Sequence, residues 1–238
     1  SGGSDKSTYS LGMSYLAQDG IMDVKNNYKR LNFRAAIDYD ATKWLKVGFN
    51  GVFSQSSQIL PNNTAWQQAF NTPGLIPVYD NNNENAKPEK YASPKSIGLS
   101  DNFKNPVATA NYYDSKNDLR QYMTNFYAQL NIVPEKLTFK TSINYNYQNI
   151  DGRTFVPTYY VESNQQSNAT SLTKTNTQYN NYIWDNTLTY KDSFGKHNFG
   201  AMLGTSMRQE TYKNLWGSAP NVPEGNDSYL YLGKGSTT

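Results

Sequence analysis

The sequence predicts an all-β fold, an antiparallel up-and-down sheet of about seven strands that suits a segment of a transmembrane β-barrel. Three observations support this prediction: apolar and polar residues alternate with a period of two, connections alternate between short and long, and aromatic residues gather near both ends of the strands. Tyr contributes 20 of the 238 residues, while hydrophobic residues reach only 37%. This composition favours pleated strands.

Period-two alternation marks seven segments as strands. The clearest is residues 137–148, in which Leu137, Phe139, Ile143, Tyr145 and Tyr147 alternate with polar residues. A helical period would scatter these apolar side chains over every face. The other six segments are residues 9–15, 30–39, 45–53, about 120–132, and a pair within 182–207 that a turn separates.

The connections between these segments differ systematically in length. Residues 40–43, 133–136 and 191–196 form tight links, whereas about 12, 65 and 30 residues follow the first, third and fifth segments, and an open stretch runs from about residue 210 to 238. Outer-membrane barrels have short periplasmic turns and long extracellular loops. Seven strands cannot close a bacterial barrel, which has an even number, so we expect residues 1–238 to be one part of a larger barrel.

Aromatic residues form two groups that fit the two interfaces of a bilayer. Tyr39, Trp44, Tyr190, Phe194 and Phe199 lie near the short turns, and Tyr15, Tyr28, Phe53, Tyr122, Tyr147, Tyr182 and Trp184 lie near the long loops. Tyr and Trp also pack well at the strand ends of a soluble sandwich, so a cell-surface β-sandwich that binds glycans stays open as the alternative. A sandwich would bury the apolar rows against a second sheet, whereas a barrel would leave them exposed.

Composition excludes several other classes of protein. Cysteine is absent, so the chain has no disulfide framework and no thiolate chemistry. The net charge of +3 is spread along the chain without a basic block, and we expect no nucleic-acid partner. His197 is the only histidine, and no GxSxG nucleophile elbow accompanies it, so we expect no catalytic residues and no enzyme, a soluble hydrolase being the remote alternative.

The stretch YDNNNEN at residues 79–85 resembles part of a calcium loop. Asp80, Asn82 and Glu84 alternate as oxygen donors, but Asn85 stands where an EF-hand needs glycine and Tyr91 stands where it needs the closing glutamate. A solvated turn is the better reading. The sequence therefore predicts neither a metal site nor a cofactor.

Successive segments of the chain resemble the SusC/RagA-type TonB-dependent transporters. The resemblance rests on GGSDKSTYSLGMSYLAQDGIM, NYKRLNFRAAIDYDATKWLKVGFN, NPVA (105–108), LTFKTSINY (137–145) and YIWDNTLTYKDSFGKHNFGAMLGTSM, in this order. It implies a 22-stranded outer-membrane barrel that imports oligosaccharides or peptides with energy from TonB. A SusD-like surface lipoprotein is the implied lid, and TonB would act through a plug domain that these residues do not contain.

This resemblance gives each face of the strands an expected environment. The alternate apolar residues should face lipid, and polar residues such as Asp185, Thr187 and Arg208 should face the lumen. Aromatic residues in the expected long loops are the candidate substrate-binding or lid-binding residues, because their faces stack on sugars or on a partner. These candidates are Trp66, Phe70, Tyr79, Tyr159, Tyr160 and Trp216, and the alternative for each is packing within its own loop.

Overall fold

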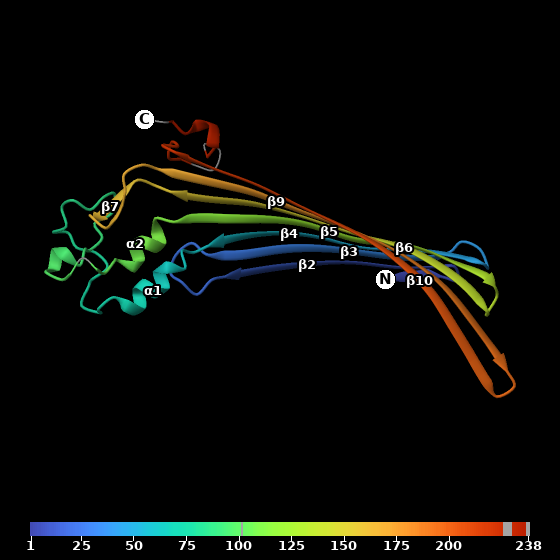
Figure 1. Ribbon diagram of the computed structural model, residues 1–238. Helices are drawn as coiled ribbons and strands as arrows, with labels where there is room; N and C mark the ends of the chain where they lie inside the picture. The colour runs from blue at the N-terminus through green and yellow to red at the C-terminus, as the bar shows by residue number, and fades with distance from the viewer. Residues whose placement is uncertain (101, 226–229, 237–238) are drawn as a thin grey trace.

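The computed structural model describes residues 1–100, 102–225 and 230–236. Long antiparallel strands run side by side from a loop-rich end to an end with tight turns (Figure 1). The described strands form an eight-stranded sheet in the order β1-β2-β3-β4-β5-β6-β9-β10 and a two-stranded sheet of β7 and β8. The predicted antiparallel up-and-down sheet is confirmed, and within the described residues this sheet does not close on itself.

The strands are longer than the alternating segments predicted. Their bounds are β1 (Gly2–Ser4), β2 (Ser7–Asp19), β3 (Asn27–Asp40), β4 (Leu45–Leu60), β5 (Asp114–Val133), β6 (Leu137–Val156), β7 (Tyr159–Glu162), β8 (Gln165–Ser167), β9 (Ser171–Phe194) and β10 (His197–Pro220). The helical elements are α1 (Thr64–Asn71), η1 (Lys95–Ile97), α2 (Pro106–Asn111) and η3 (Leu232–Lys234). The added strand length is mostly polar, and a mostly polar segment shows no alternation of apolar and polar residues from which a strand could be predicted.

Two sequence predictions about the strand ends were wrong. The expected open stretch ran from about residue 210 to 238, but its first part, to Pro220, is in fact the second half of β10. Tyr182 and Trp184 do not lie at the loop end, because β9 already begins at Ser171; Trp184 instead pairs with Ile143 and Met207 in the middle of the sheet.

The strand register places the alternating residues on two distinct faces. We call one the apolar face, since Ile37, Phe49, Phe126, Ile143 and Trp184 form a continuous row on it from β3 to β9. The opposite, polar face carries Asn50, Asn125 and Asn144 at neighbouring positions. Because neighbouring strands keep one register, a single period-two pattern per strand becomes a two-sided sheet.

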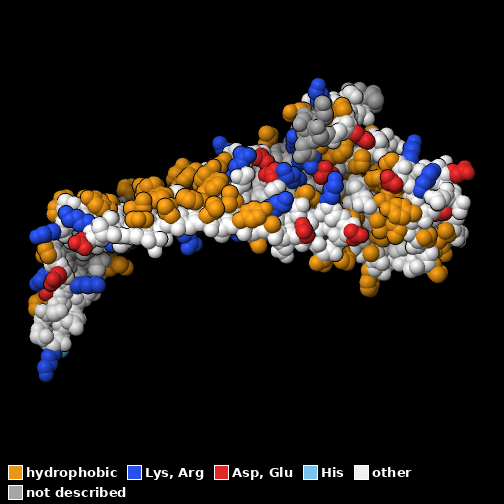
Figure 2. All heavy atoms as spheres, turned by 180° about the vertical axis from the view of Figure 1, so that it is seen from behind, with side chains coloured by type: hydrophobic (Ala, Val, Ile, Leu, Met, Phe, Trp, Pro, Cys, Tyr) orange, Lys and Arg blue, Asp and Glu red, His pale blue; other side chains and the backbone are white. Residues whose placement is uncertain are grey.

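The apolar face is exposed over a limited height. Phe126 is 55% exposed and Leu203 is 74% exposed, so no second sheet covers these rows. The band runs on β5 from about Leu130 to Tyr122, after which Arg120 lies between Gln55 and Asn149. This height agrees with the 9 to 11 residues with which a tilted strand spans a bilayer. Figure 2 shows hydrophobic side chains gathered along the sheet. The structure therefore does not support the β-sandwich alternative.

Two tight turns use backbone conformations with positive φ. Gly195, with φ of 61°, turns β9 into β10, and Glu135, with φ of 63°, turns β5 into β6. Glycine adopts this conformation without steric cost, whereas a residue with a Cβ does so rarely. Both turns lie at the end opposite the helices (Figure 1), as the pattern of short and long connections predicts.

The residues between β4 and β5, together with those between β6 and β9, fold into a module at the loop end. Its small core consists of Tyr91, Ala108, Tyr112 and Val161. A second cluster of Phe155, Leu172, Ala219, Val222 and Leu230 covers the loop-end portions of β6, β9 and β10. The described part of the chain contains no helix of sufficient length and hydrophobicity to cross a membrane.

Candidate functional site

Polar side chains of four strands form a hydrogen-bonded lattice on the polar face. Asn125 donates from Nδ2 to Asn144 Oδ1 at 2.7 Å, and Asn144 donates onward to Asp185 Oδ2 at 3.4 Å. Ser206 completes the lattice by donating to Asp185 Oδ1 at 2.6 Å. In the register Asn125 pairs with Asn144 and Ser206 pairs with Asp185, whereas Asn144 reaches Asp185 diagonally, because Asp185 pairs with Ser142.

The lattice borders a groove of about 600 Å³ in the polar face. Arg34 and Asn50 line its other side, and Asn181 contributes a buried Oδ1 that has no hydrogen-bond partner. Amide groups both donate and accept hydrogen bonds. The groove thus presents many neutral hydrogen-bonding groups, with one guanidinium, Arg34, among them.

A second polar contact on this face depends on a glycine. Tyr127 donates to Asp38, and Lys140 Nζ lies 4.6 Å from the centre of the Tyr127 ring. Gly48 lies between them, and a Cβ there would overlap the Tyr127 ring and Asp38. The absence of a side chain at Gly48 is therefore what allows Tyr127 to reach across β4 to Asp38 on β3.

Four tyrosines form a ladder through the loop module. Tyr79 stacks on Tyr91 with ring centres 5.1 Å apart, Tyr91 meets Tyr112 edge-on at 5.5 Å, and Tyr112 stacks on Tyr159 at 4.3 Å. Burial raises the pKa of Tyr91 to about 12, although the hydrogen bond from Asn111 partly opposes this shift, and burial also raises the pKa values of Tyr112 and Tyr159. The ladder is thus a packed element of the loop with an exposed end at Tyr79.

The predicted loop aromatics divide into packed and free side chains. Tyr159 packs in the ladder, and the backbone of Tyr160 forms hydrogen bonds with the backbone of Lys87. Contacts within the loop module therefore fix the positions of both residues. By contrast, Phe70 is 91% exposed and Trp66 is 51% exposed, both on α1, and Tyr79 is 56% exposed. The structure does not gather the six predicted residues into one cluster.

Trp216 does not lie in a loop as predicted. It lies on β10, where it pairs with Thr175, and it faces the polar side of the sheet with 68% of its surface exposed. Four residues earlier on the same face, Tyr212 lies 4.9 Å from Tyr179 between ring centres. The sequence pattern does not reveal this aromatic pair, because it predicts no pairing between the two strands beyond residue 210.

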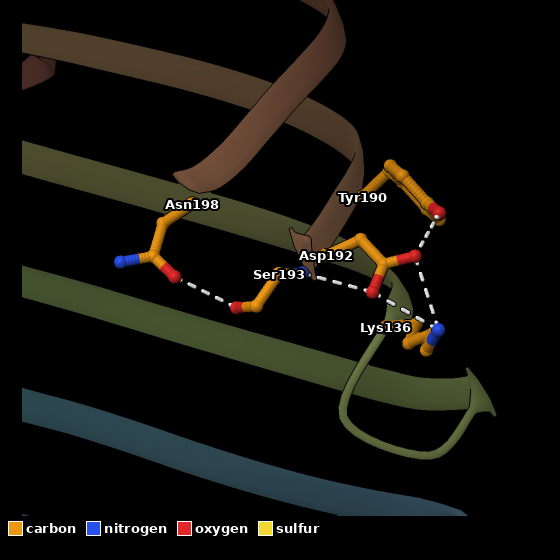
Figure 3. Close-up of polar contacts among 5 residues, drawn as sticks. All are labelled: Lys136, Tyr190, Asp192, Ser193 and Asn198. Atoms are coloured by element: carbon orange, nitrogen blue, oxygen red, sulfur yellow. Dashed lines mark hydrogen bonds and ion pairs between the residues drawn. The ribbon is translucent and has the colours of Figure 1, made fainter. Parts of the chain in front are cut away.

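Polar contacts also connect the two tight turns at the end of the sheet opposite the loop module. Lys136, in the turn before β6, forms an ion pair of 3.0 Å with Asp192 of β9, which raises the pKa of Lys136 (Figure 3). Tyr190 and the Ser193 amide also donate to the Asp192 carboxylate, at 2.8 and 2.9 Å. These contacts are exposed, so they orient the turns more than they stabilise the fold.

One sheet with an exposed apolar band on one face and a polar lattice on the other defines a class of protein. These two faces are typical of a segment of the wall of an antiparallel membrane β-barrel. Comparison with known proteins agrees with this class. No family model matches the chain, but it is 27% identical over 248 residues to TonB-dependent receptor P3 of Formosa agariphila, covering 100% of the chain and 24% of that protein.

Two further proteins are similar to the chain. TonB-dependent receptor P39 of the same organism is 26% identical over 235 residues, covering 97% of the chain and 21% of that protein. The solved structure of the RagAB peptide transporter superposes with a TM-score of 0.72 at 18% identity, covering 100% of the chain and 26% of that structure. The resemblance to a barrel segment of SusC/RagA-type TonB-dependent transporters is thereby confirmed. The chain spans about a quarter of the length of these relatives.

Proposed function

We propose that the chain forms part of the wall and outer mouth of an outer-membrane importer of the TonB-dependent class. The observation that carries this proposal is the continuous division of one sheet into an exposed apolar face and a hydrogen-bonded polar face. The apolar face contacts lipid, and the polar face lines the lumen. Residues 1–238 would then constitute one portion of a single barrel domain.

The solute that fits the polar face is an oligosaccharide or a peptide. Both are rich in hydrogen-bonding groups, and the groove beside Asn125 and Asn144 presents amides and one guanidinium, Arg34, rather than a strong field of one sign. The exposed aromatics Trp66, Phe70, Tyr79 and Trp216 would make the first contacts with this solute or with a SusD-like lid, whereas the packed Tyr159 and Tyr160 are the weaker candidates. TonB would supply energy through a plug domain, and this portion of the wall would carry out no chemical step.

Single-cysteine labelling tests the assignment of the two faces. The chain has no cysteine, so one cysteine placed at Met202 on the polar face or at Met207 on the apolar face gives a matched pair on β10. In the protein inserted in vesicles, a water-soluble maleimide should label M202C and spare M207C. A lipid-confined quencher should act on a fluorophore at M207C only. Equal labelling of both positions would refute the proposed faces.

Substrate uptake tests the role of the loop aromatics. Phe70 is almost fully exposed, so Phe70→Ala should leave the fold intact and reduce the binding of the imported solute by about 1–3 kcal/mol if its ring forms a stacking contact. Phe194→Ala, at the tight-turn end, is the matched control and should have no effect. Labelled oligosaccharides and labelled peptides, measured separately, would identify the solute class. Unchanged uptake of both in the Phe70 variant would remove that residue from the site.

A further inference from the structure

Glu162 is a buried acidic residue of the loop module with one unpartnered oxygen. It lies at the end of β7 with only 4% of its surface exposed, and its Oε2 accepts a hydrogen bond of 2.5 Å from Ser93. Its Oε1 is buried without a hydrogen-bond partner. A buried carboxylate oxygen without a partner carries the full cost of desolvation, so its position calls for a ligand.

A polar cavity of about 410 Å³ adjoins this carboxylate. Its wall combines two neighbouring segments, residues 82–85 and 93–96, with residues 160–163, which lie far from them in the sequence and include Glu162. The lining residues are Asn82, Asn83, Glu84, Asn85, Ser93, Lys95, Ser96, Tyr160, Val161, Glu162 and Ser163. Most of these side chains offer neutral or anionic oxygen atoms, which are the ligands that a hard divalent cation prefers.

Hydrogen bonds hold the lining segments in place. Asn83 donates from Nδ2 to the carbonyls of Tyr91 and Val161 at 2.9 and 3.1 Å, which ties its turn to both neighbouring segments. Asp80 accepts from the Asn82 amide at 2.9 Å and from Ser96 Oγ at 2.9 Å. The cavity is therefore formed without a ligand, and binding would not carry the free-energy cost of ordering a loop.

We propose that this cavity binds a calcium ion, with Glu162 as the central ligand and Glu84 as the second carboxylate. The stretch YDNNNEN lacks the closing glutamate of a calcium loop in sequence, because Tyr91 stands in its place. The fold brings Glu162, 69 residues beyond its hydrogen-bond partner Ser93, into the wall of the cavity that Asn82 and Glu84 also line. A distant residue thus supplies the acid that the local motif lacks.

The charge around the cavity sets the expected strength of binding. Among the described lining residues, Glu84 and Glu162 are the acids and Lys95 is the one cation. Lys90 lies nearby and occupies the carbonyls of Asn83 and Glu84 at 3.3 and 2.8 Å, so the ion would depend on side-chain oxygens. The described residues include no group of three or more His, Cys, Asp or Glu that could hold a metal ion, so the proposed site would depend on two carboxylates and on neutral oxygens. We expect a Kd of about 10⁻⁴ to 10⁻³ M, as in extracellular calcium modules.

Calorimetric titration of the detergent-purified protein with calcium chloride tests this proposal. Wild type should show one saturable site, Glu162→Gln should weaken it at least about tenfold, and Glu84→Gln should weaken it by about three- to tenfold. Glu89→Gln removes the same charge from the same loop outside the cavity and should bind as wild type does. Magnesium chloride should bind more weakly, because magnesium demands a stricter geometry.

The variants keep the proposal falsifiable even if one of them misfolds. Glu84 is exposed, so Glu84→Gln should fold whether or not Glu162→Gln does, and its comparison with Glu89→Gln would then decide. The absence of a saturable calcium signal up to about 20 mM in wild type would overturn the site, since that exceeds the Kd range of extracellular modules. Equal binding by wild type, Glu84→Gln and Glu89→Gln would also overturn it.

Discussion

Asn105 shows how single polar residues organise the loop module. It is 1% exposed, and its Nδ2 donates to the carbonyls of Val78 and Ala92 at 2.9 and 3.0 Å. Its Oδ1 accepts from the amides of Val107 and Ala108, so it also caps α2. One side chain therefore bonds to backbone groups of three segments, among them the buried carbonyl of Ala92.

Asn105→Ala should open the loop module locally. The substitution removes the helix cap, which contributes about 1 kcal/mol, and takes the side-chain donor from the buried Ala92 carbonyl, at about 1–3 kcal/mol, whereas the Val78 carbonyl keeps its hydrogen bond from the Ala92 amide. Hydrogen exchange and limited proteolysis should show faster opening between β4 and β5, with the barrel strands unchanged. Asn81→Ala, an exposed position of the same loop, is the control. Equal protection in both variants would contradict this account.

The tyrosine ladder should make the loop module sensitive to alkaline pH. The folded pKa of Tyr91 is about 12 against an ordinary value of 10.0, so the unfolded loop loses its proton first as pH rises. Below pH 10 both states are neutral, and stability should be constant. Between about pH 10 and 12 the loop should lose stability, and Tyr91→Phe should reduce this loss. Tyrosinate absorbance and proteolysis, followed together, measure it; a flat profile through pH 12 would count against burial as the cause.

At the scale of single elements, β10 contains two methionines that test the two faces. Met207 pairs with Trp184 on the apolar face, and Met202 pairs with Thr189 on the polar face. Both are exposed, at 64% and 68%, so neither substitution disturbs a packed core. The two positions differ mainly in the medium that surrounds them.

Met207→Arg should destabilise the inserted protein by about 2–4 kcal/mol if the residue lies near the bilayer midplane, because arginine at that depth loses hydration. Met202→Arg should cost far less, because its side chain enters the water-filled side. Urea unfolding in lipid vesicles measures the difference. Similar losses in both variants would show that β10 does not separate lipid from water.

At the scale of the whole molecule, the sheet has an exposed apolar face and two long edges. β10 forms one edge of the described sheet over its 24 residues, and β2 forms most of the other, because β1 covers only its first few residues. Unpaired edges invite pairing with other chains, and exposed apolar patches invite aggregation. Lipid and neighbouring strands would remove both liabilities.

The 238-residue chain by itself should therefore not form a stable monomer in water. In buffer it should aggregate and bind hydrophobic dyes, and detergent should reduce both effects by covering the apolar face. Size-exclusion chromatography with and without detergent, followed by circular dichroism, measures this. A compact monomer with a cooperative unfolding transition in detergent-free buffer would contradict the assignment of the apolar face to lipid.

The sequence by itself determined the antiparallel up-and-down sheet and the two faces of its strands. The reason is local: side chains alternate along a strand, so Leu137, Phe139 and Ile143 must share one face wherever the strand lies. Short turns such as Gly195-Lys196 are equally local, because their conformation depends on adjacent residues. The resemblance to TonB-dependent transporters was readable for the same reason, since it follows consecutive strands.

Only the tertiary structure decided the lengths of the strands and the composition of the candidate sites. The polar halves of β9 and β10 form because each strand hydrogen-bonds to its neighbour, and Trp216 therefore lies in the sheet, opposite Thr175, and not in the expected loop. The tyrosine ladder and the contact between Glu162 and Ser93 join residues from separate loops. Such contacts depend on how loops pack over the ends of strands, for which a linear pattern holds no period.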